Sequence, residues 1–443
     1  MFSRARVILA LFVLSLIGAR VTGRDLFYSL TYLWAGLLLV AFLWSLTTLR
    51  GVKITREPRS NRSQVGQLFI ERFTLSNPSR IAKLWVETKD TSDLPGFRVT
   101  TVAIGLGLGD SSDVGVHQSV TVAAGFGRGQ TRRWLTRTLC TRRGRYRLGP
   151  MTLRSSDPFG IFPRVREIPA VHHVVVLPMT VPLEGFPLPS GRLPGGEALR
   201  RRTHQITPNA AGVRDYVPGD SFSRIHWRST ARLQKLIVKE FELDPLAEIW
   251  IIFDASLTPQ FELRQPDERA KVKEDGVFQL PPSTIEYGVT AAASLAMHFL
   301  QLNRAVGFIS YGAARQVIQP EPGEAQRIRL LESLAVLNAV GDRSLQDVIK
   351  IEGPRIPQGA TAIFITPSVD TDMLAGIRRL RHTGRQPMMV LLDAASFGGP
   401  EGSHIIAEAA RRSGITARIL SYGDNLGEVL GSPIRPLRVP RIA

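Results

Sequence analysis

The stretch AEIWIIFDAS, residues Ala247–Ser256, marks a change in the pattern of the sequence. Its centre, Ile249–Phe253, is a continuous apolar run, which is typical of a strand buried on both faces of a sheet. From here to the C-terminus, apolar runs such as VGFISYG and ATAIFIT alternate with amphipathic stretches such as TIEYGVTAAASLAMHFLQLNRA and DMLAGIRRLRH. This alternation predicts parallel strands joined by helices, so we assign residues 246–443 to a doubly wound α/β domain.

The preceding residues 51–185 follow a different pattern. Short runs rich in β-branched and aromatic residues alternate with turn residues, as in QLFIERFTLSN, AKLWVETKD, FRVTTVAIG, SVTVAAG and VVVLP. Several short strands at this spacing predict an antiparallel β-sandwich domain. Within it, Asp157-Pro158 predicts the start of a turn, and Gly160 permits the backbone to reverse. Residues 186–245 form a Pro- and Gly-punctuated linker and a distinctive basic segment.

The N-terminal residues 1–50 have the composition of membrane helices. Leu26–Leu49 contains 24 residues and no charge, and about 20 such residues suffice to cross a bilayer. Val7–Ala19 is apolar over 13 residues; it fits either the core of a signal peptide or a second span completed past a snorkelling Arg20. We favour a transmembrane helical hairpin.

Charge near the two spans predicts their orientation. Seven positive residues lie outside the hairpin and two, Arg20 and Arg24, lie between the spans. By the positive-inside rule, both ends and the soluble domains are expected in the cytoplasm, with the anchor in the plasma or inner membrane. The net charge of +18 is consistent with contact to anionic lipid, while no zinc pattern or run of stacking aromatics favours nucleic acid. Cys140 is the sole cysteine, which excludes an internal disulfide.

The basic segment reads GVRDYVPGDSFSRIHWRSTARLQKLIVKEFELD, from Gly212 to Asp244. Its Pro-Gly-Asp turn predicts a helix from Ser221 to about Leu233 that Asp220 would cap, followed by a strand. Three interpretations stay open: a capped turn with a core Trp227, a basic docking surface, or a catalytic pair of Asp220 and His226. The candidate docking residues are Arg214, Asp220, Arg224, Arg228, Arg232 and Lys239.

The same segment resembles the signature of a bacterial family, domain of unknown function 58. The upstream RRGRYRLGPMTLRSSDPFGIF, residues 142–162, resembles a second hallmark of that family. The resemblance implies a membrane-anchored protein whose α/β domain is similar to von Willebrand factor A domains. It also implies partners: a MoxR-type AAA+ ATPase and a transglutaminase-like membrane protein. No enzymatic activity is implied.

The resemblance further implies a metal site. Von Willebrand A-like domains often hold Mg²⁺ through an Asp-x-Ser-x-Ser motif after the first strand, with a Thr and an Asp from two further loops. The corresponding ligands here are Asp254, Ser256, Thr258 and Ser344, with Pro367-Ser368-Val369-Asp370 as the third loop. Alternatively, Asp254 and Ser256 only cap the turn that follows the strand.

We therefore expect a membrane-anchored cytoplasmic interaction protein. Changes in its basic segment would be the most direct test of this expectation. The alternative is a metal-dependent hydrolase that uses an Asp254-bound metal or Asp220. A third possibility is a structural envelope component whose sandwich binds partners.

Overall fold

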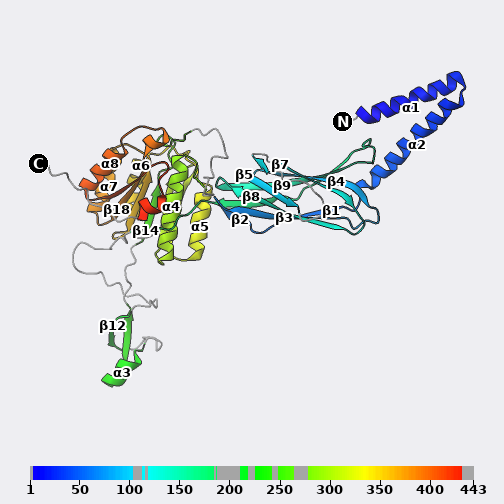
Figure 1. The fold of residues 1–443 in the computed structure, drawn as a ribbon. Coiled ribbons are helices and arrows are strands. Elements are labelled where there is room, and N and C mark those ends of the chain that lie inside the picture. The colour runs from blue at the N-terminus through cyan, green and yellow to red at the C-terminus, as the bar shows by residue number, and fades with distance from the viewer. Residues whose placement is uncertain are drawn as a thin grey trace. The chain divides into compact units, whose positions relative to one another are not determined.

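A computed structural model describes residues 3–102, 112–114, 118–183, 186, 210–217, 225–241, 248–263 and 278–431 (Figure 1). The chain divides into two compact units. One comprises residues 1–179 together with 266–279, and the other comprises residues 180–265 together with 280–443.

Two apolar helices begin the first unit, as predicted. Helices α1 (Ser3–Thr22) and α2 (Asp25–Thr48) are joined by a turn in which Gly23 takes a positive φ of 65°. Both are long and apolar enough, by length and composition, to cross a membrane. They contact each other where the Thr31 hydroxyl lies 3.2 Å from that of Ser15. Together they could form a membrane anchor.

Two β-sheets follow and pack face to face. The first has the order β1-β3-β8-β5-β6 and the second the order β2-β11-β9-β4-β7, with β10 beside β9. Their bounds are β1 Lys53–Pro58, β2 Arg62–Gln64, β3 Leu68–Ser76, β4 Lys83–Ser92, β5 Gly96–Val102, β6 Ser112–Val114, β7 Gln118–Phe126, β8 Thr131–Cys140, β9 Gly144–Ser155, β10 Arg164–Ile168 and β11 His172–Leu177. Neighbouring strands are antiparallel except β2 and β11.

The core of this unit forms between the two sheets. Phe73 of β3 and Trp134 of β8 stack with their ring centroids 5.4 Å apart, and they share one buried cluster with Met151 and Leu153 of β9. Buried residues alternate with more exposed ones along β3 and β8, because successive side chains of a strand point to opposite faces. The region is thus sandwich-like, as predicted.

The predicted turn after β9 depends on Asp157. This buried carboxylate accepts hydrogen bonds from the backbone N–H groups of Phe159 (3.0 Å) and Phe162 (2.6 Å). Gly160 takes a positive φ of 69°, which only glycine adopts at little cost. The turn within residues 142–162 is therefore held by specific hydrogen bonds of Asp157.

The second unit contains a six-stranded sheet of order β16-β15-β14-β17-β18-β19. Neighbours are parallel except the antiparallel edge strand β16. The strands are β14 Ile249–Phe253, β15 Val306–Tyr311, β16 Arg315–Glu321, β17 Thr361–Thr366, β18 Gln386–Leu392 and β19 Thr416–Leu420. The alternating pattern correctly predicted the parallel strands, but not β16.

Helices cover both faces of this sheet, as a doubly wound fold requires. They are α4 Thr284–Gln301, α5 Glu324–Ala335, α6 Leu345–Glu352, α7 Asp372–His382, α8 Ser403–Arg412 and α9 Leu426–Gly431. Residues of α6, α7 and α8 share one core cluster with Trp250 and Ile252 of β14. On the other face, α4 approaches so closely that a Cβ on Gly288 would lie 2.9 Å from the Phe253 ring. Figure 1 shows α4 and α7 on either side of the sheet.

The basic segment folds differently from the prediction. Strands β12 (Ala210–Asp215) and β13 (Ile237–Phe241) pair as an antiparallel ladder, and helix α3 covers only Trp227–Leu233. Ile225 is not helical; it forms a β-bridge with Val238, and the N–H of His226 donates to the Ile237 carbonyl at 2.8 Å. Because β13 engages this backbone, the helix begins at Trp227 rather than at Ser221. Trp227 is 66% exposed, which contradicts the interpretation that it is a core residue.

Candidate functional site

The carboxyl ends of β14 and β17 meet at the place where the chain reverses its direction of winding across the sheet. From β14 the chain passes to β15 on one side, and it later returns to β17 on the other side. In open α/β sheets, ligands bind in the crevice at such a switch point. The residues that follow β14 and end β17 are therefore the first candidates for a functional site.

Asp254 occupies this position and is only 3% exposed. Its Oδ1 accepts hydrogen bonds from the Ser256 hydroxyl (2.5 Å) and the Ser256 N–H (3.1 Å), and its Oδ2 accepts one from the Thr366 hydroxyl (2.6 Å). Burial raises the pKa of the Asp254 carboxyl, while the hydrogen bonds from Ser256 and Thr366 act in the opposite direction. The result is a compact cluster of oxygen atoms from two parallel strand ends.

The structure brings only part of the predicted metal set together. Asp254 and Ser256 are in direct contact, whereas Thr258 is exposed. The exposed Ser344 caps helix α6: its Oγ accepts from the Asp347 N–H at 3.2 Å and donates to the Asp347 carboxylate at 2.8 Å. Asp370 of the predicted third loop is also exposed and accepts a hydrogen bond from the Asp372 N–H.

Thr366, which no sequence motif indicated, completes the oxygen cluster in place of a predicted loop ligand. The oxygen donors of Asp254, Ser256 and Thr366 are of the type that a hard cation such as Mg²⁺ prefers. Among the residues that the structure describes, however, no three His, Cys, Asp or Glu side chains are grouped so that they could hold a metal. A cation here would depend on one carboxylate, on hydroxyl groups and on water.

The loop between α5 and α6 packs against the carboxyl-terminal edge of the sheet, beside Ser256. Its Gly341 forms a β-bridge with Ser256, donates its N–H to the Ala255 carbonyl (2.9 Å) and accepts from the Leu257 N–H (3.0 Å). A Cβ at Gly341 would lie 2.0 Å from the Tyr311 carbonyl oxygen, so only glycine fits here without displacement. This contact fixes the loop against the ends of β14 and β15.

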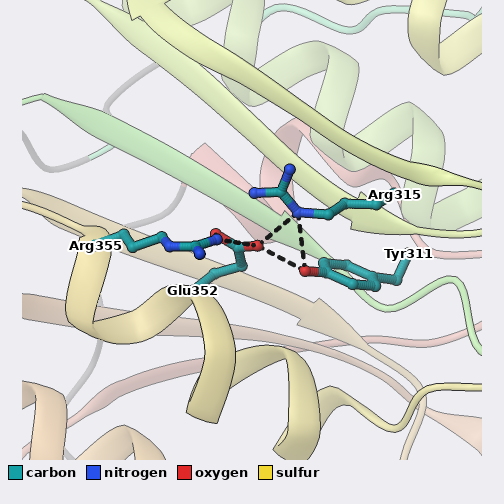
Figure 2. Close-up of polar contacts among 4 residues, drawn as sticks. All are labelled: Tyr311, Arg315, Glu352 and Arg355. Carbon is teal, nitrogen blue, oxygen red and sulfur yellow. Dashed lines mark hydrogen bonds and ion pairs between the residues drawn. The ribbon is translucent and has the colours of Figure 1, made fainter.

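A polar cluster lies at the same loop, where β15, β16 and the end of α6 meet. Glu352 ends α6, and its side chain is 3% exposed. Its Oε1 accepts from the Tyr311 hydroxyl (2.6 Å) and from the Nε of Arg315 (2.8 Å), while Arg355 in the 3₁₀ turn η3 (Gly353–Arg355) donates from Nη1 at 3.1 Å to both carboxylate oxygens. Figure 2 shows the two guanidinium groups approaching Glu352 from different directions.

The electrostatics of this cluster are set by the paired charges. Burial by itself would raise the pKa of Glu352, but the hydrogen bonds from Arg315, Tyr311 and Arg355 outweigh it and lower the pKa to about 2. Burial and the hydrogen bond to Glu352 raise the pKa of Tyr311. This cluster could not be predicted from the sequence, because its members come from separate elements and form no motif.

The cluster borders an open hollow of about 780 Å³. The charged and aromatic side chains that line it are Tyr311, Arg315, Asp342, Arg343 and Arg355. Gly312, which also lines it, approaches the Asn338 carbonyl so closely that a Cβ there would lie 2.9 Å from the oxygen.

The predicted docking residues divide into three groups. Arg228 and Arg232 are exposed on α3, one helical turn apart. Arg214 lies on β12 opposite Val238, and Lys239 lies on β13 opposite Val213. Asp220 and Arg224 lie outside the described residues.

The candidate catalytic histidine has a local partner. The Nδ1 of His226 lies 2.6 Å from the Ser229 hydroxyl at the start of α3. Asp220, its proposed catalytic counterpart, lies outside the described residues.

Part of this chain is similar to a known protein family. Residues 212–392 match the family described as "Protein of unknown function DUF58". The match includes the basic segment and the strand ends of β14, β15 and β17, and it does not extend to residues 142–162. The uncharacterized protein YeaD of Bacillus subtilis (strain 168) is 23% identical over 166 residues, which cover 37% of this chain and 36% of the relative. The chain thus spans about a third of the length of this curated relative.

Two of the similar solved structures each match 28% of the chain. A CARDB domain from Pyrococcus furiosus matches 28% of this chain and 87% of that domain, at 10% identity and a TM-score of 0.18. A cohesin module from a Clostridium perfringens glycoside hydrolase matches 28% of this chain and 96% of that module, at 11% identity and a TM-score of 0.20. At TM-scores this low, the likeness supports no inference about fold or function.

Proposed function

We propose that this chain is a membrane-anchored interaction protein that docks a partner through the segment β12-α3-β13. The observation that carries the proposal is the composition and exposure of α3. None of its residues is buried, Trp227 is 66% exposed, and Arg228 and Arg232 are exposed beside it. Trp and Arg are the residue types enriched at the energetic centres of protein interfaces.

The basic segment has a scaffold that can present these side chains. Ile225, Ile237 and Val238 are buried, and the Thr230 hydroxyl accepts a hydrogen bond from the Ile237 N–H at 3.1 Å. Lys235 pairs with Asp215 at 2.9 Å. These contacts hold α3 against the β12-β13 ladder. Its exposed face should therefore lose little conformational entropy when a partner binds.

The partner class follows from the family resemblance. We propose a MoxR-type AAA+ ATPase as the partner, with a transglutaminase-like membrane protein as a second component. The hairpin α1-α2 would hold the complex at the plasma or inner membrane, with the soluble units on the cytoplasmic side, as the distribution of positive residues favours.

The proposal is tested by affinity purification of the full chain from detergent-solubilised membranes. The wild type is compared with Trp227→Ala and with the double change Arg228→Glu, Arg232→Glu. Recovery of an AAA+ ATPase, identified by mass spectrometry, should fall about tenfold or more in both variants, because a central Trp and paired arginines each contribute at least about 2 kcal/mol in such interfaces.

Arg412→Glu on α8 is the matched control, because its side chain is 77% exposed and its charge is reversed in the same unit. It should leave ATPase recovery unchanged. Thermal unfolding separates docking from folding: an exposed Trp227 predicts a change within about 0.5 kcal/mol on truncation. Equal recovery of the ATPase with all four proteins would refute docking through α3.

The cytoplasmic orientation has its own test. Cys140 is buried and has a raised pKa owing to its burial, so a membrane-impermeant maleimide should not label the wild type. A cysteine introduced at Arg412 should be labelled only after cells are opened. Labelling of intact cells would place the soluble units outside.

A second candidate function rests on the oxygen cluster at the switch point. We propose that Asp254, Ser256 and Thr366 would hold Mg²⁺ in a domain similar to von Willebrand A domains, and that this site would serve either partner binding or a hydrolase. The central position of β14 and the Asp-x-Ser sequence at its end support this proposal. When bound, such an ion would act as a Lewis acid toward an oxygen ligand.

Titration of the full chain with Mg²⁺ by calorimetry tests this candidate without a substrate. Asp254→Ala should abolish the heat of binding, while Asp370→Ala, which removes an exposed carboxylate from the neighbouring loop, should retain it. Binding that survives Asp254→Ala would assign the ion to another site.

A further inference from the structure

The hollow beside Glu352 displays guanidinium donors that the fold itself does not use. Arg315 contacts Glu352 and Tyr311 through Nε alone, and Arg355 contacts Glu352 through Nη1 alone. Within the described part of the chain, both Nη groups of Arg315 and the Nη2 of Arg355 have no hydrogen-bond partner. The two side chains are 50% and 63% exposed, and both line the hollow.

The two arginines are nevertheless held in place. Glu352 is buried, and it fixes one nitrogen of each guanidinium group. An exposed arginine ordinarily loses considerable rotamer freedom when it binds a ligand. Here part of that freedom is already lost in the folded protein, so the remaining donors are preorganised for an acceptor.

The charge balance indicates which acceptor fits. The hollow is bordered by three arginines, Arg315, Arg343 and Arg355, and by two carboxylates, Asp342 and Glu352. It therefore carries one net positive charge. One surplus charge suits a monoanion better than a dianionic phosphate, which would also be repelled by Asp342. Planar guanidinium groups match a carboxylate in two-point hydrogen bonding.

We propose that this hollow binds a carboxylate group, presented by an acidic side chain of a peptide segment in a partner protein. The open shape of the hollow suits a side chain that enters from a neighbouring surface. None of the residues that line the hollow belongs to α3 or to the oxygen cluster at Asp254, so the site extends the proposed function without depending on it.

Saturation-transfer NMR on the full chain in lipid nanodiscs tests the proposal, because the method detects weak ligands of large proteins. The probes are acetyl-Gly-Asp-Gly-amide, its uncharged analogue acetyl-Gly-Asn-Gly-amide, sodium acetate, and inorganic phosphate as a competitor. The Asp peptide should bind about tenfold more tightly than the Asn peptide, which corresponds to about 1.4 kcal/mol. It should also bind more tightly than acetate, and acetate should displace it better than phosphate does at equal concentration.

Two variants locate the binding in the hollow. Arg355→Lys keeps the charge but removes the planar guanidinium group, and it should lower the affinity for the Asp peptide about tenfold. Arg343→Gln removes a lining charge that is not tied to Glu352, so its effect does not depend on the buried ion pairs. Arg329→Lys on α5, half-exposed and paired with Glu321, is the matched control and should bind as the wild type does.

Four results would overturn the assignment. Equal affinity for the Asp and Asn peptides would exclude carboxylate recognition. Stronger displacement by phosphate than by acetate, or equal affinity for acetate and the Asp peptide, would exclude an acidic peptide as the ligand. Unchanged affinity in both Arg355→Lys and Arg343→Gln would exclude the hollow. If the ATPase does not bind through α3, these peptide-binding results can still be interpreted, because they do not depend on α3.

Discussion

Glu352 is buried and charged, and its stability contribution depends on pH. Its pKa in the folded protein is about 2, below the ordinary value of 4.5. A lowered folded-state pKa adds stability above the unfolded-state pKa, and that stability is lost as the pH falls through the folded-state value. Because its arginine partners are half-exposed, we expect Glu352→Gln to cost about 1–3 kcal/mol at pH 7.

Urea unfolding at pH 7, 4 and 3 checks this prediction. The difference between wild type and Glu352→Gln should shrink steadily between pH 4.5 and pH 2. Glu321→Gln, which removes a 55% exposed partner of Arg329, should change stability by no more than about 0.5 kcal/mol. A difference that is the same at all three pH values would contradict the assigned charge of Glu352.

Arg56 is a second buried charge, and it joins the two sheets of the sandwich. It pairs with Glu71 of its own sheet at 3.3 Å and with Asp90 of the facing sheet, and its guanidinium lies 5.2 Å from the Phe73 ring centroid. Removing one member of a buried charge cluster leaves its partners uncompensated, so Arg56→Met should destabilise the sandwich by about 3–5 kcal/mol.

Differential scanning calorimetry can resolve this effect if the two compact units unfold separately. Arg56→Met should lower the unfolding temperature of the sandwich. Arg72→Met, at an exposed position of β3, should change the stability of the sandwich by no more than about 0.5 kcal/mol. An unchanged sandwich transition in Arg56→Met would mean that the buried cluster contributes nothing to stability.

At the scale of elements, the loop between α5 and α6 is held by backbone contacts at Gly341. A Cβ there would meet carbonyl oxygens of Tyr311 at 2.0 Å and Ala255 at 2.9 Å, and neither is a flexible side-chain end. Gly341→Ala should therefore displace the loop and destabilise the second unit by about 1–3 kcal/mol. Val340→Ala, at a 56% exposed neighbour, should be nearly neutral.

Hydrogen exchange measured by mass spectrometry reports on this loop. The amide of Leu257, which donates to the Gly341 carbonyl, should exchange faster in Gly341→Ala and as in the wild type in Val340→Ala. Equal protection in all three proteins would show that the loop tolerates a side chain at this position.

At the scale of the whole molecule, the junction between the helical hairpin and the sandwich belongs to the folded core. Leu49 and Val52 are buried in the sandwich cluster, and the carbonyls of Thr47 and Leu49 accept hydrogen bonds from Lys83 and Arg166. A chain that begins at Thr47 should therefore fold and dissolve without detergent. A chain that begins at Lys53 should be less stable by about 2–5 kcal/mol, because it lacks two buried apolar residues.

Fractionation and thermal unfolding of the two truncated chains check this expectation. The full chain should stay with membranes after an alkaline carbonate wash, and both truncated chains should be released. Equal unfolding temperatures for the two truncated chains would place the boundary of the sandwich after Val52.

Several features could be predicted from the sequence because they depend on local periodicity. The apolar helices α1 and α2, the alternating strands of the sandwich and the parallel strands of the α/β unit all follow from hydrophobic patterns within single segments. The turns at Asp157 and after Asp254 also follow from local residue chemistry. The strand β16, which carries Pro320, and the helix α6, which spans only eight residues, were missed.

Tertiary structure decided the rest, because it depends on strand order rather than on spacing. Thr366 reaches Asp254 across 112 residues of sequence only because β17 lies beside β14. Tyr311 and Arg315 reach Glu352 across 41 and 37 residues because the hairpin β15-β16 and the end of α6 lie at one edge. The start of α3 at Trp227 likewise depends on the pairing of Ile225 with Val238, which no local sequence pattern indicates. The sequence by itself determined most of the elements, and the fold determined which of their polar side chains meet.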